Sequence, residues 1–280
     1  MSYYDRHTQC LKYGKVEWRD TIGNDNNDRL SNITAANSKA VVVDGVDSVN
    51  TGGDVGQFSD IKVIDNGNTT PTPIIVYYDR NNKCLKFAEG TEEKVNHSVS
   101  WSITKINNPS SGIDFGRYVA MEMDDNNGLH VVAQDVTKGI LYYGYFEDGV
   151  AANPTGGWKK VDATGSVGRW NDIKLENPKG ESILACKPVI TSMDSSKLNT
   201  TSAIKLARYI DDTNGFESET VPSLYESTDK KLSVVVNAAE TGKVENINSS
   251  SPVENAGIVN KYAVGYTSTM YAVDFLRGEK

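Results

Sequence analysis

Residues 77–88 read Tyr-Tyr-Asp-Arg-Asn-Asn-Lys-Cys-Leu-Lys-Phe-Ala, and residues 3–14 read Tyr-Tyr-Asp-Arg-His-Thr-Gln-Cys-Leu-Lys-Tyr-Gly. The two stretches are identical at 7 of 12 positions and begin 74 residues apart. Fainter copies occur at residues 135–144 and 203–209. Similarity within one chain at such spacings indicates a structural unit that is used several times. We therefore expect a repeat protein.

A second motif lies between these copies. Residues 55–65, Val-Gly-Gln-Phe-Ser-Asp-Ile-Lys-Val-Ile-Asp, resemble residues 115–125 and 167–176, with residues 256–264 as a plausible fourth copy. The shared glycines are 60, 52 and 89 residues apart. The repeats therefore carry insertions of different lengths.

The two motifs together predict a unit of four strands. Residues 58–65 form a first strand, residues 73–79 a second, and residues 84–88 a third, and a fourth begins at Trp101. The second strand is apolar on both faces, so a further layer must pack on each side of it. Repeated four-stranded antiparallel sheets stacked around an axis provide those layers, which predicts an all-β fold, the β-propeller.

The number of blades follows from counting motifs. Four copies of each motif favour four blades, although apolar runs within residues 29–50 and 225–248 leave a fifth blade open. Residues 260–275 read as opening strands of a blade. We expect them to complete the N-terminal blade and close the ring, so that residues 1–280 form a single domain. No helix is predicted.

These motifs resemble the blades of bacterial surface and secreted β-propeller repeat proteins of the broad sialidase-like kind. The resemblance covers most of the chain and implies the fold rather than an activity. It also implies a secreted or cell-surface location. Because Met1-Ser-Tyr-Tyr-Asp5 has no basic or apolar leader character, any targeting signal is expected to lie outside this sequence.

Composition excludes several classes of function. A net charge of -8 over 280 residues argues against nucleic acid as a partner, and no apolar run is long enough to span a membrane. The three cysteines, Cys10, Cys84 and Cys186, form no Cys-x-x-Cys pair. His7, His97 and His130 lack the spacing of metal ligands. The sequence therefore predicts neither a metal nor a cofactor, with His130 as a core or channel residue.

The candidate binding residues follow the shared glycines, where each inner strand would begin at the mouth of the channel. Arginine beside an aromatic ring suits a carboxylate, a phosphate or the face of a sugar. In the alternative interpretation the rings wedge between blades, and the arginines pair with Asp60 and Asp172. The candidate residues are Gln57, Phe58, Arg117, Tyr118, Arg169 and Trp170.

Other acidic residues are better explained by turns than by chemistry. Asp5, Asp79 and Asp135 each precede a tight turn, where an aspartate accepts hydrogen bonds from turn amides. Residues 124–128, Asp-Asp-Asn-Asn-Gly, have oxygen ligands but not the spacing of a calcium loop, and they fit a hairpin turn. Residues 65–68 fit the same kind of turn.

The leading hypothesis is a non-catalytic module that binds a glycan or a protein, because the repeats are symmetric and show no catalytic cluster. Whether the chain is an enzyme stays open, and no catalytic residue is assigned. A glycoside-processing enzyme on the same scaffold is one alternative, and would need a pair of carboxylates on one pocket. A structural subunit of a larger surface assembly, of undetermined oligomeric state, is the other.

Overall fold

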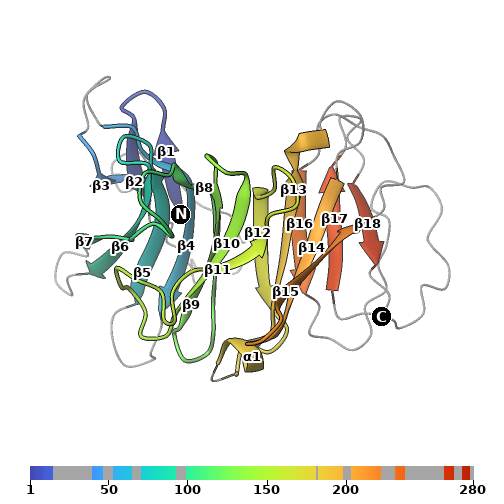
Figure 1. Cartoon of the computed structure of the whole chain (residues 1–280). Helices are drawn as coiled ribbons and strands as arrows, with labels where there is room; N and C mark the ends of the chain where they lie inside the picture. Colours follow the sequence, from blue (N-terminus) through green and yellow to red (C-terminus); the bar gives the residue numbers. More distant parts are fainter. Residues whose placement is uncertain are drawn as a thin grey trace, which may run out of the picture.

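The computed structural model describes residues 1–14, 40–46, 53–64, 71–92, 99–180, 182–197, 203–221, 231–236, 262–267 and 273–277. These residues form five antiparallel sheets, which follow one another in chain order across the molecule (Figure 1). Three of the sheets have four strands, and the first and the last have three. The chain is therefore all-β, as the sequence predicts.

Each sheet is made of consecutive strands. The first contains β1 (Ser2–Asp5), β2 (Cys10–Tyr13) and β3 (Val41–Asp44). The second contains β4 (Val55–Ile64), β5 (Thr72–Asp79), β6 (Cys84–Glu92) and β7 (Val99–Lys105). The third contains β8 (Phe115–Met123), β9 (Leu129–Asp135), β10 (Ile140–Phe146) and β11 (Lys159–Asp162). The fourth contains β12 (Arg169–Leu175), β13 (Pro188–Asp194), β14 (Ala203–Asp211) and β15 (Gly215–Val221). The fifth contains β16 (Lys231–Val236), β17 (Tyr262–Thr267) and β18 (Val273–Arg277).

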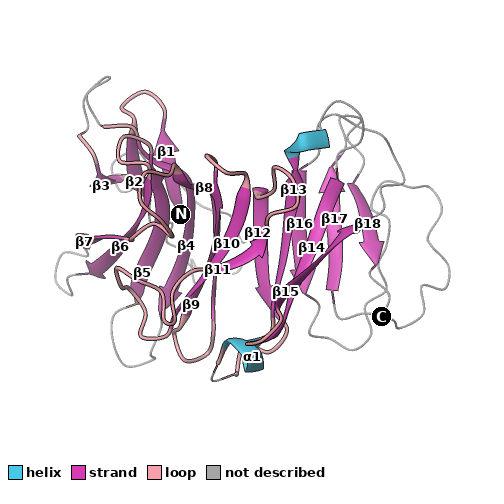
Figure 2. Ribbon diagram, viewed as in Figure 1, coloured by secondary structure: helices cyan, strands magenta, loops and turns pink. Residues whose placement is uncertain are grey.

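Helix is nearly absent from the part of the chain that the structure describes (Figure 2). The single turn α1 (Ile183–Cys186) begins where the Ser182 side chain accepts a hydrogen bond from the Ala185 amide, and a 3-10 turn covers Ser195–Lys197. Neither helix could cross a membrane. The expectation of no helix was thus wrong only for two short turns.

The second strands are buried on both faces, as their composition predicts. Every residue of β9 and of β13 is buried, and in β5 only Thr72 is not. Apolar side chains from neighbouring sheets fill the spaces on either side. One cluster joins the second sheet to the third through Phe87, Phe115 and Phe146, and another joins the third to the fourth. The core is therefore a series of layers between successive sheets.

The first strands of the sheets are also in contact with one another. β4 contacts β8, β8 contacts β12, and β12 contacts β16. In addition, β5 contacts β8 and β9 contacts β12, so the second strand of each sheet packs on the first strand of the next. The inner strands thus lie beside one another along one side of the stack of sheets.

The two sequence motifs meet at these junctions. A side chain at Gly116 would place its Cβ 2.8 Å from the Leu85 side chain. At Gly56 the Cβ would lie 2.7 Å from that of Leu11. Both glycines have positive φ, 123° and 103°, a backbone conformation that L residues rarely adopt. Glycine is therefore required in the inner-strand motif because the leucine of the preceding Cys-Leu-Lys motif packs directly on it.

Three details differ from the sequence-based expectations. The structure shows five sheets rather than four, because residues 231–236 pair in full register with β17. Strand β17 lies between β16 and β18, so both of its edges are used within the C-terminal sheet. The described terminal strands accordingly form separate sheets and do not share one. The expected first strand at 256–264 is also misplaced, since β17 is a middle strand and residues 256–261 lie outside the described residues.

Candidate functional site

Each of the three fully described inner strands contains a β-bulge at the same place. In β4, Gln57 pairs with Tyr78 and Asp60 with Val76, so two residues of the inner strand oppose one of its neighbour. The same two-to-one pairing occurs in β8 and β12. Bulges of this kind bend a strand and re-aim its side chains. The repeat therefore places one irregular position on each inner strand.

An aromatic residue occupies every bulge in the left-handed conformation. The φ angle is 53° at Phe58, 54° at Tyr118 and 53° at Trp170. Such a conformation costs about 1–3 kcal/mol for a residue other than glycine and is found mainly where the surroundings impose it. Its repetition in three sheets shows that the position of the ring is imposed by the fold.

The three rings form a continuous row across three sheets, which we call the aromatic row. The centroids of Phe58 and Tyr118 are 4.5 Å apart, and those of Tyr118 and Trp170 are 5.2 Å apart. Phe58 and Tyr118 are partly buried, whereas Trp170 is 41% exposed. The row therefore packs the inner strands together, as the wedge interpretation predicts, and also presents an open tryptophan at one end.

Arg117 is already engaged by the protein. Its guanidinium donates to Asp114 Oδ2 at 3.0 Å and lies over the Tyr78 ring, 5.7 Å from the centroid. The Tyr78 hydroxyl donates to the other oxygen of Asp114 at 2.6 Å. The partner of Arg117 is thus an acid three residues earlier in the chain, and neither Asp60 nor Asp172.

Gln57 repeats this arrangement one sheet earlier. Its amide donates to Asp54 Oδ1 at 2.8 Å, and the Tyr4 hydroxyl donates to the same oxygen at 2.7 Å. Asp54 Oδ2 also forms a salt bridge with the Arg80 guanidinium at 2.9 Å. These interactions hold the start of β4 against the first sheet, so Gln57 also has a structural role.

Arg169 differs from its two counterparts. Ser166 lies three residues before Arg169, where Arg117 has Asp114. In the preceding sheet, Gln134 occupies the position that Tyr78 occupies relative to Arg117. Gln134 is buried and donates to the Val167 carbonyl at 2.7 Å. Among the residues that the structure describes, the Arg169 side chain has neither a hydrogen-bond nor an ion-pair partner. Of the predicted binding residues, Arg169 and Trp170 are therefore the two that remain available to a ligand.

Further along the inner strands, charged side chains bridge the sheets. Glu122 on β8 forms two salt bridges. Its Oε1 lies 2.6 Å from Lys62 Nζ on β4, and its Oε2 lies 2.5 Å from Lys174 Nζ on β12. Burial alone would raise the pKa of Glu122, but the hydrogen bonds from Lys174 and Lys62 bring it below its usual value. This bridge stabilises the contact between three successive sheets.

Asp60 links neighbouring strands through their backbones. Its Oδ1 accepts from its neighbour Ile61 at 2.7 Å, and its Oδ2 accepts from the Met121 amide on β8 at 2.8 Å. Burial raises its pKa, and the nearby charge of Asp172 adds to this effect. Asp172 makes the corresponding bond to the Ile173 amide at 2.9 Å. Both oxygens of Asp60 are thus occupied by amides.

The turn interpretation of the repeated aspartates is confirmed. Asp5 Oδ1 accepts from the His7 amide, Asp79 Oδ1 from Asn82 and Asp135 Oδ1 from Thr137. Residues 124–128 likewise form the turn between β8 and β9, since Asp124 Oδ1 accepts from the amides of Asn126 and Gly128. Residues 65–68 and His97 lie outside the described residues.

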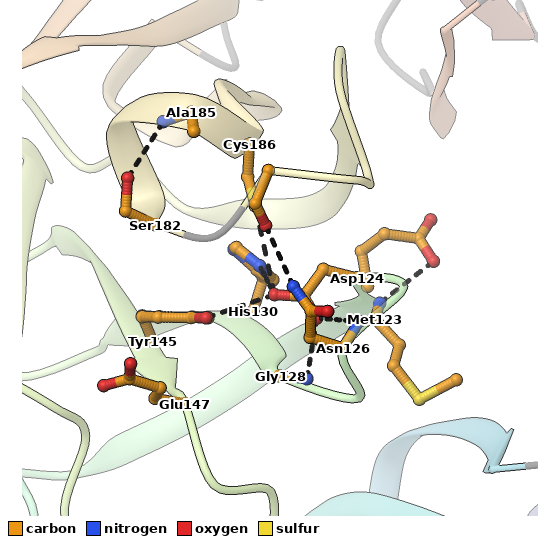
Figure 3. A network of polar contacts seen from close by, with 12 residues as sticks. Met123, Asp124, Asn126, Gly128, His130, Tyr145, Glu147, Ser182, Ala185 and Cys186 are labelled. Atoms are coloured by element: carbon orange, nitrogen blue, oxygen red, sulfur yellow. Dashed lines mark hydrogen bonds and ion pairs between the residues drawn. The ribbon is translucent and has the colours of Figure 1, made fainter. Parts of the chain in front are cut away.

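Sequence reasoning missed one cluster, in which Asp124, His130 and Cys186 meet in the interior (Figure 3). His130 Nε2 lies 3.3 Å from Asp124 Oδ2, and Cys186 Sγ lies 3.9 Å from the same oxygen. All three side chains are buried. The prediction that His130 belongs to the core is confirmed, but its partners come from separate parts of the chain. Cys186 follows Asp124 by 62 residues, a spacing that no local motif shows.

Comparison with known proteins gives little further guidance. No model of a protein family matches the chain, and no curated protein matches it. Among solved structures, the chain is similar to the crystal structure of AofleA from Arthrobotrys oligospora, with 11% sequence identity and a TM-score of 0.40. The alignment covers 86% of this chain and 74% of that chain. At this level the similarity carries no argument about function, which must be inferred from the geometry.

Proposed function

We propose that the chain is a non-catalytic ligand-binding module with a β-propeller arrangement, and that it binds a glycan at Trp170 and Arg169. The observation that carries the proposal is the difference among the three bulges. Arg117 and Gln57 are tied to acids, whereas Arg169 has no partner among the described residues and stands next to a ring that is 41% exposed. The bulge of β12 thus leaves its polar side chain and its ring accessible, whereas the equivalent residues of β4 and β8 are held by contacts within the protein.

The propeller arrangement is supported by the order of contacts. The sheets stack through buried faces, and their first strands lie side by side from β4 to β16. A propeller would place these strands around a central channel, with the bulges near its mouth. A crystal structure of the full chain tests this part of the proposal, and an open arc of sheets would contradict it.

The chemistry of the pair favours a sugar. An indole face covers the apolar face of a pyranose, and a guanidinium donates parallel hydrogen bonds to a carboxylate or to adjacent hydroxyls. A protein partner would need about 800 Å² of contact surface. Among the residues that the structure describes, the large exposed hydrophobic side chains on strands, such as Val63, Ile103 and Ile210, each lie on a different strand.

A glycoside-processing enzyme has one observation in its favour, the raised pKa of Asp60 near a second acid, Asp172. A general acid must deliver its proton to the glycosidic oxygen, and its carboxyl group must therefore be free to contact substrate. Each carboxylate oxygen of Asp60 instead accepts a hydrogen bond from a backbone amide. A structural clamp explains Asp60 better than catalysis does. Hydrolysis of aryl glycosides that is lost in Asp60→Asn would support the enzyme.

The binding proposal is tested with a glycan array that includes neutral, sialylated and uronic acid-containing glycans. We expect Trp170→Ala and Arg169→Ala each to reduce the signal at least tenfold. Arg80→Ala and Ile210→Ala, which remove an exposed arginine and an exposed apolar residue elsewhere, should leave it unchanged. A cooperative thermal transition in each would show that the first two variants are folded.

A blank array, or a signal that survives both Trp170→Ala and Arg169→Ala, would contradict the glycan proposal. Arg117→Ala separates the two roles of the repeat, since it should lower the melting temperature through loss of its Asp114 and Tyr78 contacts. The secreted or surface location suggested by the sequence remains a prediction, and is part of the same proposal.

A further inference from the structure

The interior cluster introduced above lies where the third sheet meets the fourth. Asp124 stands just after β8, His130 lies on β9, and Cys186 ends the short helix α1 that leads into β13. Their ligand atoms all lie within 4.8 Å of one another. Figure 3 shows the imidazole, the thiol and the carboxylate pointing toward one another from these three elements.

We propose that Asp124, His130 and Cys186 form a structural binding site for one transition-metal dication of the zinc type. A thiolate, an imidazole nitrogen and a carboxylate oxygen are the three ligand types that zinc takes from proteins. Alkaline-earth cations prefer oxygen ligands alone, and this cluster supplies only one such residue among three. The ligand set therefore selects the class of ion.

The distances suit a tetrahedral ion. With metal–ligand bonds of about 2.0–2.3 Å, tetrahedral ligands lie roughly 3.3–3.6 Å from one another. His130 Nε2 is 3.3 Å from Asp124 Oδ2, which already has this separation. Cys186 Sγ is 3.9 Å from the same oxygen, and all three ligand atoms lie within 4.8 Å of one another, so the thiol would move inward to complete a tetrahedral set.

The two oxygens of Asp124 behave differently. Oδ1 accepts from the amides of Gly128 and Asn126 at 2.8 and 2.9 Å, the usual length of a hydrogen bond. Around Oδ2 the spacing is looser, with the Tyr145 hydroxyl at 3.2 Å, His130 at 3.3 Å and Cys186 at 3.9 Å. These three groups lie farther from Oδ2 than the amides lie from Oδ1. Oδ2 is therefore the carboxylate oxygen that faces the imidazole and the thiol and could be shared with them by a metal.

The surroundings hold two of the ligands in place. The Tyr143 hydroxyl contacts His130 Nδ1 at 2.6 Å, which leaves Nε2 for the cluster. In metal sites the second nitrogen of a ligating histidine usually makes such a bond. The backbone amides on Oδ1 fix the carboxylate of Asp124 in the same way.

Two glycines, Gly128 and Gly180, lie so close to the cluster that a side chain at either position would collide with it. A Cβ at Gly128 would lie 2.6 Å from Asp124 Oδ2, and one at Gly180 would lie 2.4 Å from the Cys186 amide nitrogen. The Cys186 thiol donates to the Gly180 carbonyl at 3.1 Å. Metal binding would replace that bond by a metal–sulfur bond and release the thiol proton to solvent.

A metal here would be structural. The three ligands are buried, and the Gly180 carbonyl and the Tyr145 hydroxyl lie beside them, so that protein groups surround the site. A closed site of this kind contributes stability instead of chemistry. It would tie α1 and the start of the fourth sheet to the third.

The test uses the full chain after treatment with a chelator. Titration with Co²⁺ should give one equivalent bound per chain, with the visible bands of tetrahedral cobalt and a near-ultraviolet band from a thiolate ligand. Zn²⁺ should displace the cobalt and raise the melting temperature by several degrees. Metal content after dialysis against zinc, measured by mass spectrometry, gives an independent count in the unmodified protein.

Three variants assign the site. Cys186→Ser should remove the thiolate band and the zinc-dependent rise in melting temperature, and His130→Gln should weaken binding at least tenfold. Cys84→Ser changes another buried free cysteine and should keep both signals. Less than 0.1 equivalent of bound zinc in the unmodified protein would overturn the proposal, whatever the variants show. A thiolate band that persists in Cys186→Ser would overturn it as well.

Discussion

Gly116 and Leu85 are in direct contact, because a Cβ added to the glycine would lie 2.8 Å from the leucine side chain. Gly116 belongs to the inner-strand motif and Leu85 to the hairpin motif of the preceding sheet. The two repeated sequences are therefore complementary surfaces. A substitution in one of them should therefore change the packing at the junction between the two sheets.

Gly116→Ala tests this contact. Gly116 has a φ of 123°, and Gly156 also has a positive φ, 70°, but with nothing within 4 Å of an added Cβ. Gly156→Ala should therefore cost only the strain of an alanine in the left-handed conformation, about 1–2 kcal/mol. Gly116→Ala should lower the free energy of unfolding by about 2–4 kcal/mol, since it adds overpacking against the core. Urea denaturation measures both, and equal losses would contradict the close approach.

The bulge predicts an unusual order of substitutions at Tyr118, whose φ is 54°. Tyr118→Val and Tyr118→Gly both remove the ring between Phe58 and Trp170. Only the valine keeps the strained backbone, and a β-branched residue tolerates it poorly. We expect the valine variant to be less stable than the glycine variant by about 1–2 kcal/mol. In a regular strand the order would be reversed.

Glu122 should carry a pH-dependent part of the stability. Its pKa is lowered in the folded protein from the ordinary value of 4.5, so it stabilises the fold above that pH, and the effect is lost as the pH falls through the folded pKa. Glu122→Gln should lower the free energy of unfolding by about 1–3 kcal/mol at pH 7.

The difference from wild type should shrink as the pH falls below 4.5, and should vanish once the carboxylate is protonated in the folded protein as well. High salt should reduce it as well, because the bridge is partly exposed. Glu147→Gln, at an exposed residue, is the matched control and should change stability little at any pH. A constant penalty for Glu122→Gln from pH 3 to pH 7 would show that the ion pairs do not cause it.

Asp79 and Asp211 begin the same turn in different settings. Each accepts from the amide and the side chain of the asparagine three residues later, Asn82 or Asn214. Asp79 is fully buried and pairs with Lys86 at 2.7 Å, whereas Asp211 lies at the surface. Asp79→Asn should destabilise by about 2–4 kcal/mol because it removes the fully buried member of the two carboxylates that pair with Lys86.

Asp211→Asn should have only a small effect on the melting temperature. Differential scanning calorimetry of the two variants gives the comparison directly. Similar losses would mean that the turn itself, and not the buried ion pair, accounts for the stability at Asp79.

The local features of the fold could be predicted from the sequence. The repeated hairpin motif predicts β5 and β6, and the shared glycine locates the inner strands β4, β8 and β12. The motifs do not predict the fifth sheet, because its first strand, Lys231–Val236, lacks the glycine and the aromatic residue that mark the others. The apolar residues of this segment predict a strand, but they do not show which strand of a four-stranded unit it is.

The site was predictable only in outline. The aromatic residues were found because they repeat, but the distinction between Arg117 and Arg169 depends on their neighbours. Asp114 and Tyr78 satisfy the first arginine, and Ser166 stands in the place of the acid near the second. The cluster at Asp124 could not be predicted, since its members have no repeated counterpart and meet only through tertiary packing.

Every sheet consists of strands that are consecutive in the chain, and its main contacts reach only the sheets next to it. During synthesis each sheet can therefore pair its strands as soon as they have left the ribosome, without waiting for a distant segment. On heating, one sheet can lose its pairing while the sheets beyond its neighbours keep theirs, as in other repeat proteins whose stability is a sum over neighbouring units. The calorimetric transition of the chain would then be broader than that of an all-or-none domain of the same size.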